Sequence, residues 1–74
     1  MEAATVEVFK TDVQKVWQAE KIIGVLRQLF PGSRINFDLE DCDNILRVES
    51  DRVKSQTIEF ALQEEGYHCI ELED

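Results

Sequence analysis

The chain has 74 residues, of which sixteen are acidic and eight basic, so its formal net charge is −8. Hydrophobic residues at 43% and charged residues at 32% are typical of a globular protein, and we expect a single domain over residues 1–74 with its core at about 5–73. The scattered basic residues and acidic balance argue against nucleic acid and anionic membranes as partners. No apolar run could span a membrane and MEAATVEV differs from a secretory signal, so we expect a cytoplasmic location.

The first element that the sequence predicts is a strand over residues 5–9, TVEVF, which alternates polar and apolar residues. This alternation places Val6 and Val8 toward the core. Phe9 is then expected on the opposite face of the sheet.

An amphipathic helix is predicted over residues 13–30, with Thr11 and Gln14 at the spacing of a capping box. Pro31 and Gly32 end it. Its apolar stripe recurs at helical spacing and comprises Val13, Val16, Trp17, Ala19, Ile22, Ile23, Leu26, Leu29 and Phe30. Trp17 is interpreted as a partly buried aromatic residue at the rim of the core and not as a ligand platform.

Two alternating runs over residues 33–39 and 45–49 predict a hairpin, joined by a turn rich in Asp and Asn. The residues expected to face the core are Ile35, Phe37, Leu39, Leu46 and Val48. Because the first of these strands is expected at an edge of the sheet, it could accept a strand from another chain.

A second helix is predicted to start between Ser50 and Ser55 and to end at Gly66, which suits a left-handed C-cap. Its buried stripe is expected to comprise Val53, Ile58, Ala61 and Leu62. The last strand is predicted over residues 67–72. Its alternation places His68, Ile70 and Leu72 toward the interior and Cys69 on the opposite face.

The order βαββαβ predicts an α+β fold, a ferredoxin-like open-faced sandwich with an antiparallel sheet in the order 4-1-3-2 and both helices on one face. The opposite face is expected to be mostly polar. Phe9, Ile45 and Cys69 are its apolar residues, and they form the candidate protein-contact patch if they cluster.

At this size and element order, the chain resembles the heavy-metal-associated (HMA) domains of copper chaperones and metal-transporting ATPases. Lys10 and Thr11 close the first strand as in that family, and EEGY leads into the last strand. The family captures soft metal ions with a Met-Thr-Cys-x-x-Cys loop. Here its two cysteine positions fall on Asp12 and Lys15. The resemblance therefore implies the fold of that family and a metal motif that has lost both thiolates. We expect no cofactor.

A relocated metal site is the alternative, because the expected topology gathers three loops at one end of the sheet. The potential ligands there are Asp12, Cys42, His68 and Cys69, a mixed set of the kind that zinc accepts. The expected geometry opposes such a site in two ways. Cys42 and Cys69 are expected about 10 Å apart on separated strands, and adjacent residues of a strand, such as His68 and Cys69, point to opposite faces.

The stretch DLEDCDNILRVE also has part of the spacing of a calcium loop, with Asp38, Glu40 and Asn44 at positions 1, 3 and 7, but a thiol, Cys42, at position 5. However, Asp43 occupies the position where glycine makes the sharp turn, and strands are expected on both sides. Cys42 is surrounded by four carboxylates, which disfavours a reactive thiolate. We therefore interpret this stretch as an acidic hairpin turn.

No motif places a nucleophile beside a base, and no glycine-rich phosphate loop is present, so we expect no catalytic residues and no enzymatic activity. Two hypotheses follow. The first is a small interaction module that binds a protein partner, or a second copy of itself, through the open sheet face or an edge strand. The second is residual metal binding, of a metallochaperone-like kind, by Asp12, Cys42, His68 or Cys69.

Overall fold

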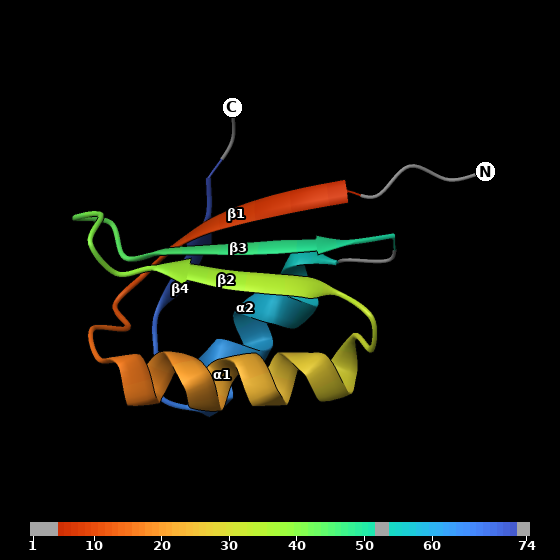
Figure 1. Cartoon of the computed structure of the whole chain (residues 1–74), viewed down its shortest axis with the longest axis horizontal. Helices are drawn as coiled ribbons and strands as arrows, with labels where there is room; N and C mark the ends of the chain where they lie inside the picture. Colours follow the sequence, from red (N-terminus) through yellow and green to blue (C-terminus); the bar gives the residue numbers. More distant parts are fainter. Residues whose placement is uncertain (1–4, 52–53, 73–74) are drawn as a thin grey trace.

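The computed structural model describes residues 5–51 and 54–72 and has the element order βαββαβ. The elements are β1 (Thr5–Thr11), α1 (Val16–Leu29), β2 (Arg34–Asp38), β3 (Ile45–Ser50), α2 (Ser55–Glu64) and β4 (Cys69–Glu71). They form two layers, a four-stranded sheet and a pair of helices (Figure 1). The α+β class is confirmed. Val53, expected in the second helix, and residue 73, the expected limit of the core, lie outside the described residues.

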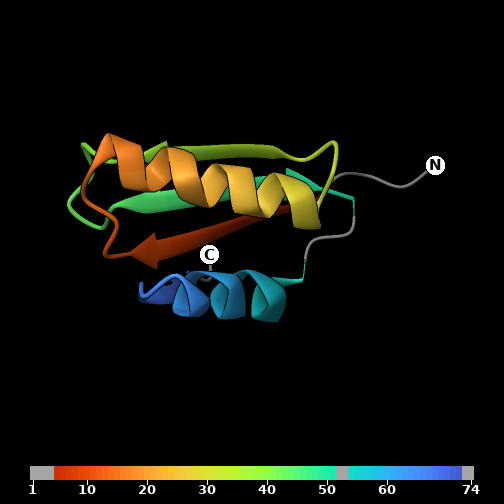
Figure 2. The same cartoon turned by 90° about the horizontal axis from the view of Figure 1, so that it is seen from below.

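All the strand pairs are antiparallel, and the strand order is β2-β3-β1-β4. Counted from the β4 edge, this is the order 4-1-3-2. Both helices cover the same face of the sheet, α1 beneath the half that contains β2 and β3, and α2 beneath the half that contains β1 and β4 (Figure 2). The other face is open, and β2 and β4 are the two edges.

The core lies between the sheet and the helices, and its strand residues come from all four strands. Phe9 pairs with Leu46 of β3, and Thr11 pairs with Cys69 of β4, so these residues share the helix-facing side. The most deeply buried side chains are Phe9, Val13, Ile22, Leu26, Leu46, Val48, Ile58 and Leu62. They join both layers, and their burial provides the main stabilisation of the fold.

The expected orientation of the first and last strands is wrong. Phe9 is fully buried, whereas Val6 is 48% exposed. In β4, Cys69 is buried and Ile70 is 63% exposed. Both faces of β1 carry apolar residues, so its alternation is compatible with either orientation, and burying the large Phe9 ring removes more apolar surface. Because cross-strand partners share a face, β4 reverses together with β1.

The first helix begins at Val16, three residues later than expected. Its N-terminus is capped by Gln18, whose Oε1 accepts hydrogen bonds from the backbone N–H groups of Lys15 (3.1 Å) and Gln14 (3.2 Å). Val16 and Trp17 are 68% and 64% exposed, so neither belongs to the core. The prediction of Trp17 as a partly buried residue is therefore wrong, because Trp17 lies on the side of α1 opposite to its buried residues Ala19, Ile22 and Leu26.

The second helix ends as predicted, at a glycine in the left-handed conformation. Gly66 has φ 91°. Its N–H donates to Gln63 O (3.0 Å), and the N–H of Tyr67 donates to Leu62 O (2.9 Å), which together form a Schellman motif. Within residues 5–51 and 54–72, neither helix has the length and apolar character needed to cross a membrane.

Candidate functional site: a groove beside an edge strand

The three loops at one end of the sheet meet, as the topology predicts. Thr11, at the end of β1, is the centre of this contact. Its N–H donates to Asp43 O (3.2 Å), and its hydroxyl donates to Asn44 O (2.7 Å) and accepts from Val13 N–H (3.2 Å). Thr11 therefore anchors the hairpin turn to the start of the α1 segment and does not cap the helix.

Asp12 belongs to the same end of the molecule and contacts the segment before β4. Its Oδ1 accepts a hydrogen bond from the backbone N–H of His68 (2.9 Å). The His68 side chain is exposed, so its expected interior position is wrong, because its strand has the opposite orientation. The Asp12 carboxylate thus fastens a loop. Asp12 and Lys15, which occupy the positions of the two missing cysteines, both precede α1.

The two cysteines lie in different environments. Cys42 is exposed in the hairpin turn, and Cys69 is buried in β4. Burial, followed in size by the nearby carboxylates of Glu59 and Asp12, raises the pKa of the Cys69 thiol to about 12. A thiol with this pKa is protonated at neutral pH, whereas metal ions bind the thiolate. Cys69 is therefore a poor ligand.

The four predicted ligands do not converge. Among the described residues, the potential metal ligands that come together in a group of three are Asp41, Cys42 and Asp43, whose ligand atoms lie within 4.8 Å of one another. Asp41 Oδ1 already accepts a hydrogen bond from Asp43 N–H (2.8 Å), and Asp43 pairs with Lys10 at 3.6 Å. These contacts are those of an acidic turn, as interpreted from the sequence.

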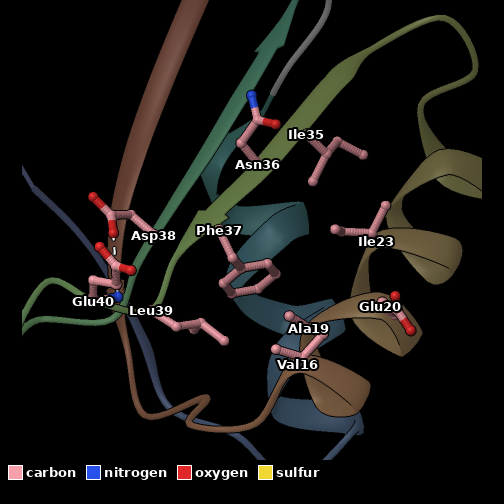
Figure 3. A pocket seen from close by; sticks show the side chains of 10 residues that line it. All are labelled: Val16, Ala19, Glu20, Ile23, Ile35, Asn36, Phe37, Asp38, Leu39 and Glu40. Atoms are coloured by element: carbon pink, nitrogen blue, oxygen red, sulfur yellow. Dashed lines mark hydrogen bonds between the residues drawn. The ribbon is translucent and has the colours of Figure 1, made fainter.

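A groove of about 470 Å³ lies between α1 and β2, on the side of the sheet covered by the helices (Figure 3). Phe37 points from β2 toward α1, and Ile35 faces Ile23 of the helix. Asn36 points away from the groove, as the alternation of a strand requires. The apolar lining comprises Val16, Ala19, Ile23, Ile35, Phe37 and Leu39. Phe37 and Leu39 are half-buried and Val16 is exposed, so this apolar surface remains accessible.

The charged residues that line the groove are all acidic: Glu20 on α1, and Asp38 and Glu40 at the end of β2. Asp38 Oδ1 accepts a hydrogen bond from Glu40 N–H (3.2 Å), which shapes the chain as it leaves the strand. The groove thus combines an apolar floor, an acidic rim and an edge strand. An apolar centre with a polar rim is the usual anatomy of a protein-contact surface. The lining residues include no Ser, Cys, His, Lys or Arg.

The open sheet face is the second accessible apolar surface. Phe9 and Cys69, expected there, lie in the core, and Ile45 lies on the open face as predicted. The apolar residues that cross-strand pairing places on this face are Val6, Val8, Ile45, Ile70 and Leu72.

Comparison with protein-family models, with curated proteins and with solved structures gives no match. The function of this chain is therefore inferred from its own geometry. Sequence reasoning identified β2 as an edge strand but missed the groove. The available signal was Val16, an apolar residue at helical spacing on the side of α1 that faces the edge strand.

Proposed function

We propose that this protein is a small interaction module that binds an extended strand of another polypeptide chain along the β2 edge, beside α1. The observation that carries this proposal is the apolar groove between α1 and an unpaired strand edge. In strand addition, main-chain hydrogen bonds to an edge provide affinity, and pockets for alternate side chains provide specificity. The groove and the edge together offer both.

The backbone of β2 is oriented for this role. Val8 O accepts a hydrogen bond from Leu72 N–H (2.8 Å), so Val8 directs its backbone groups toward β4. In an antiparallel sheet, successive residues of a strand direct their backbone N–H and C=O groups to opposite sides. Two residues paired across neighbouring strands direct these groups either toward each other or away from each other. Asn36 of β2 consequently bonds to β3, and Ile35 and Phe37 direct their N–H and C=O groups to the open edge.

The residues that present free backbone groups thus also direct their side chains toward the groove. A strand added at this edge would place every second side chain over the same apolar floor. The partner that fits is an extended segment with apolar side chains at alternate positions.

The finer fold assignment, a ferredoxin-like sandwich of the HMA-like type that has lost its metal motif, remains our proposal. It is supported by the strand order and by Asp12 and Lys15 at the positions of the missing thiols. The alternative of residual metal binding gains no support, because Asp12 already holds the His68 backbone and the Cys69 thiol is buried.

The proposal is tested by titrating short extended peptides with apolar residues at every second position into ¹⁵N-labelled protein. We expect chemical-shift changes at the Ile35 and Phe37 amides. Val16→Glu should weaken binding by about tenfold or more, because bound peptide would desolvate the new charge on the groove floor. Trp17→Glu is the matched control, since this neighbouring side chain is equally exposed but does not line the groove. Shifts confined to Val8, Ile45 and Ile70 would instead place binding on the open sheet face.

A further inference from the structure

We propose that the strand bound at this edge is β2 of a second copy of the chain, so that the protein is a homodimer joined through antiparallel β2 strands. This inference rests on the proposed function, because it requires that the β2 edge accept a strand. It goes further by naming the occupant and its register.

The sequence of β2, Arg-Ile-Asn-Phe-Asp, is complementary to itself when it is reversed. In an antiparallel pair centred on Asn36, Arg34 lies opposite the partner's Asp38, and Ile35 lies opposite the partner's Phe37. Asn36 lies opposite the partner's Asn36 on the two-fold axis. Each protomer therefore contributes one charge of each sign, and the contact is isologous, as a two-fold dimer requires.

The hydrogen-bonding directions of β2 agree with this register. Ile35 and Phe37 direct their backbone groups to the open edge, so they would form the hydrogen-bonded pairs between the two protomers. Asn36 and its counterpart would form a non-hydrogen-bonded pair, in which the Cα atoms are about 4.5 Å apart. The Arg34–Asp38 pairs are also non-hydrogen-bonded, the type of pair in which facing side chains lie closest.

Charge and packing favour the same partner. Arg34 and Asp38 are both exposed, and neither takes part in the two ion pairs described within the chain, Lys10–Asp43 and Lys21–Glu65. On the helix side, the half-buried Phe37 ring of each protomer would extend the apolar floor of the other. Aromatic–aliphatic pairs and opposite charges directly across two strands both stabilise pairing.

The other edge of the sheet lacks these features. β4 has only three residues, and a short edge strand is a common protection against pairing. β2 has five residues, with apolar side chains at its second and fourth positions and opposite charges at its two ends. The structure therefore points to β2 as the self-associating edge.

The first experiment compares molar masses by light scattering over a concentration series. We expect a species of twice the 8.6 kDa of the chain. Arg34→Asp and Asp38→Arg should each weaken the dimer by about tenfold or more, because each converts two attractive cross-strand pairs into repulsive ones. The double variant, which exchanges the two charges, should restore it. Circular dichroism verifies that each variant is folded.

The second experiment tests the register by crosslinking, and it does not depend on the charges. Asn36→Cys in a Cys42→Ser background should form an intermolecular disulfide under mild oxidation, because the Cα separation across the axis suits this bond. Arg34→Cys in the same background is the matched control. It lies on the same strand and face, but the two copies of this position would be about 13 Å apart.

The outcomes separate the two proposals. This inference is overturned if the protein is a monomer at every concentration. It is also overturned if the dimer is unaffected by the charge reversals, or if the dimer crosslinks through position 34. If a monomer still shows peptide-induced shifts at Ile35 and Phe37, the proposed function stands without the homodimer. An extended basic peptide, attracted by the acidic rim, would cause such shifts. A monomer that binds none of the peptides removes both.

Discussion

Individual residues of the same type have different chemistry in this molecule because their surroundings differ. Cys42 and Cys69 are both free thiols, but one is exposed in an acidic turn and the other is buried between a strand and the helices. The pKa of Cys69 rises from its ordinary value of 9.0 to about 12, first through burial and then through Glu59 and Asp12. This buried thiol behaves as a small apolar residue and not as a nucleophile or ligand.

A dependence of stability on alkaline pH follows from the raised pKa of Cys69. Between pH 9 and about 12 the folded state retains the thiol proton and the unfolded state loses it, so the free energy of unfolding should fall as pH rises. The slope from this group is about 1.4 kcal/mol per pH unit at most. Urea unfolding at several pH values should show that Cys69→Ala removes this contribution, while Cys42→Ala, the control, retains it. Equal slopes in the two variants would contradict the assignment.

At the scale of the elements, local hydrogen bonds decide where each helix begins and ends. Gln18 caps α1 from within its first turn, and the Schellman motif at Gly66 ends α2. The sequence predicted the end of α2 because few residues other than glycine adopt positive φ. It did not predict the start of α1, because Thr11 has the composition of a cap but uses its hydroxyl to hold the hairpin.

Two glycine substitutions should have opposite effects on stability. Gly24→Ala lies inside α1, where an added Cβ meets no atom within 4 Å, so it should raise the free energy of unfolding by about 0.8 kcal/mol. Gly66→Ala also meets no atom but would adopt φ 91°, and it should lower that free energy by about 1 kcal/mol. Thermal and urea unfolding measure both. Destabilisation by both variants would show that helix propensity does not govern position 24.

At the scale of the whole molecule, packing of the helices against the sheet selects which face of each strand is buried. Burial of Phe9 fixes the orientation of β1. It also fixes the orientation of β4, because Phe9 pairs with Glu71 and Thr11 pairs with Cys69. It also moves an apolar group, including Val6 and Ile70, to the open face. One side chain thereby determines the composition of two surfaces.

The orientation of β1 is tested by two truncations. Phe9→Ala should lower the free energy of unfolding by about 3–5 kcal/mol, because it empties a fully buried site. Val6→Ala, on the same strand but 48% exposed, should lower it by less than about 1 kcal/mol. Chemical denaturation of both variants gives the comparison. The orientation expected from the sequence, with Val6 toward the core, gives the reverse ranking, so a larger loss for Val6→Ala would overturn the observed orientation.

The sequence by itself determined the order of the six elements, the edge position of β2, the acidic hairpin turn and the glycine that ends α2. These depend on periodicity and on residues with restricted backbone preferences, which act over a few neighbouring positions. Only the tertiary structure decided the orientation of β1 and β4, the exposure of His68 and Trp17, and the groove beside β2. A period of two specifies alternation but not which face is inside, and a groove between α1 and β2 exists only once two separately coded elements have packed together.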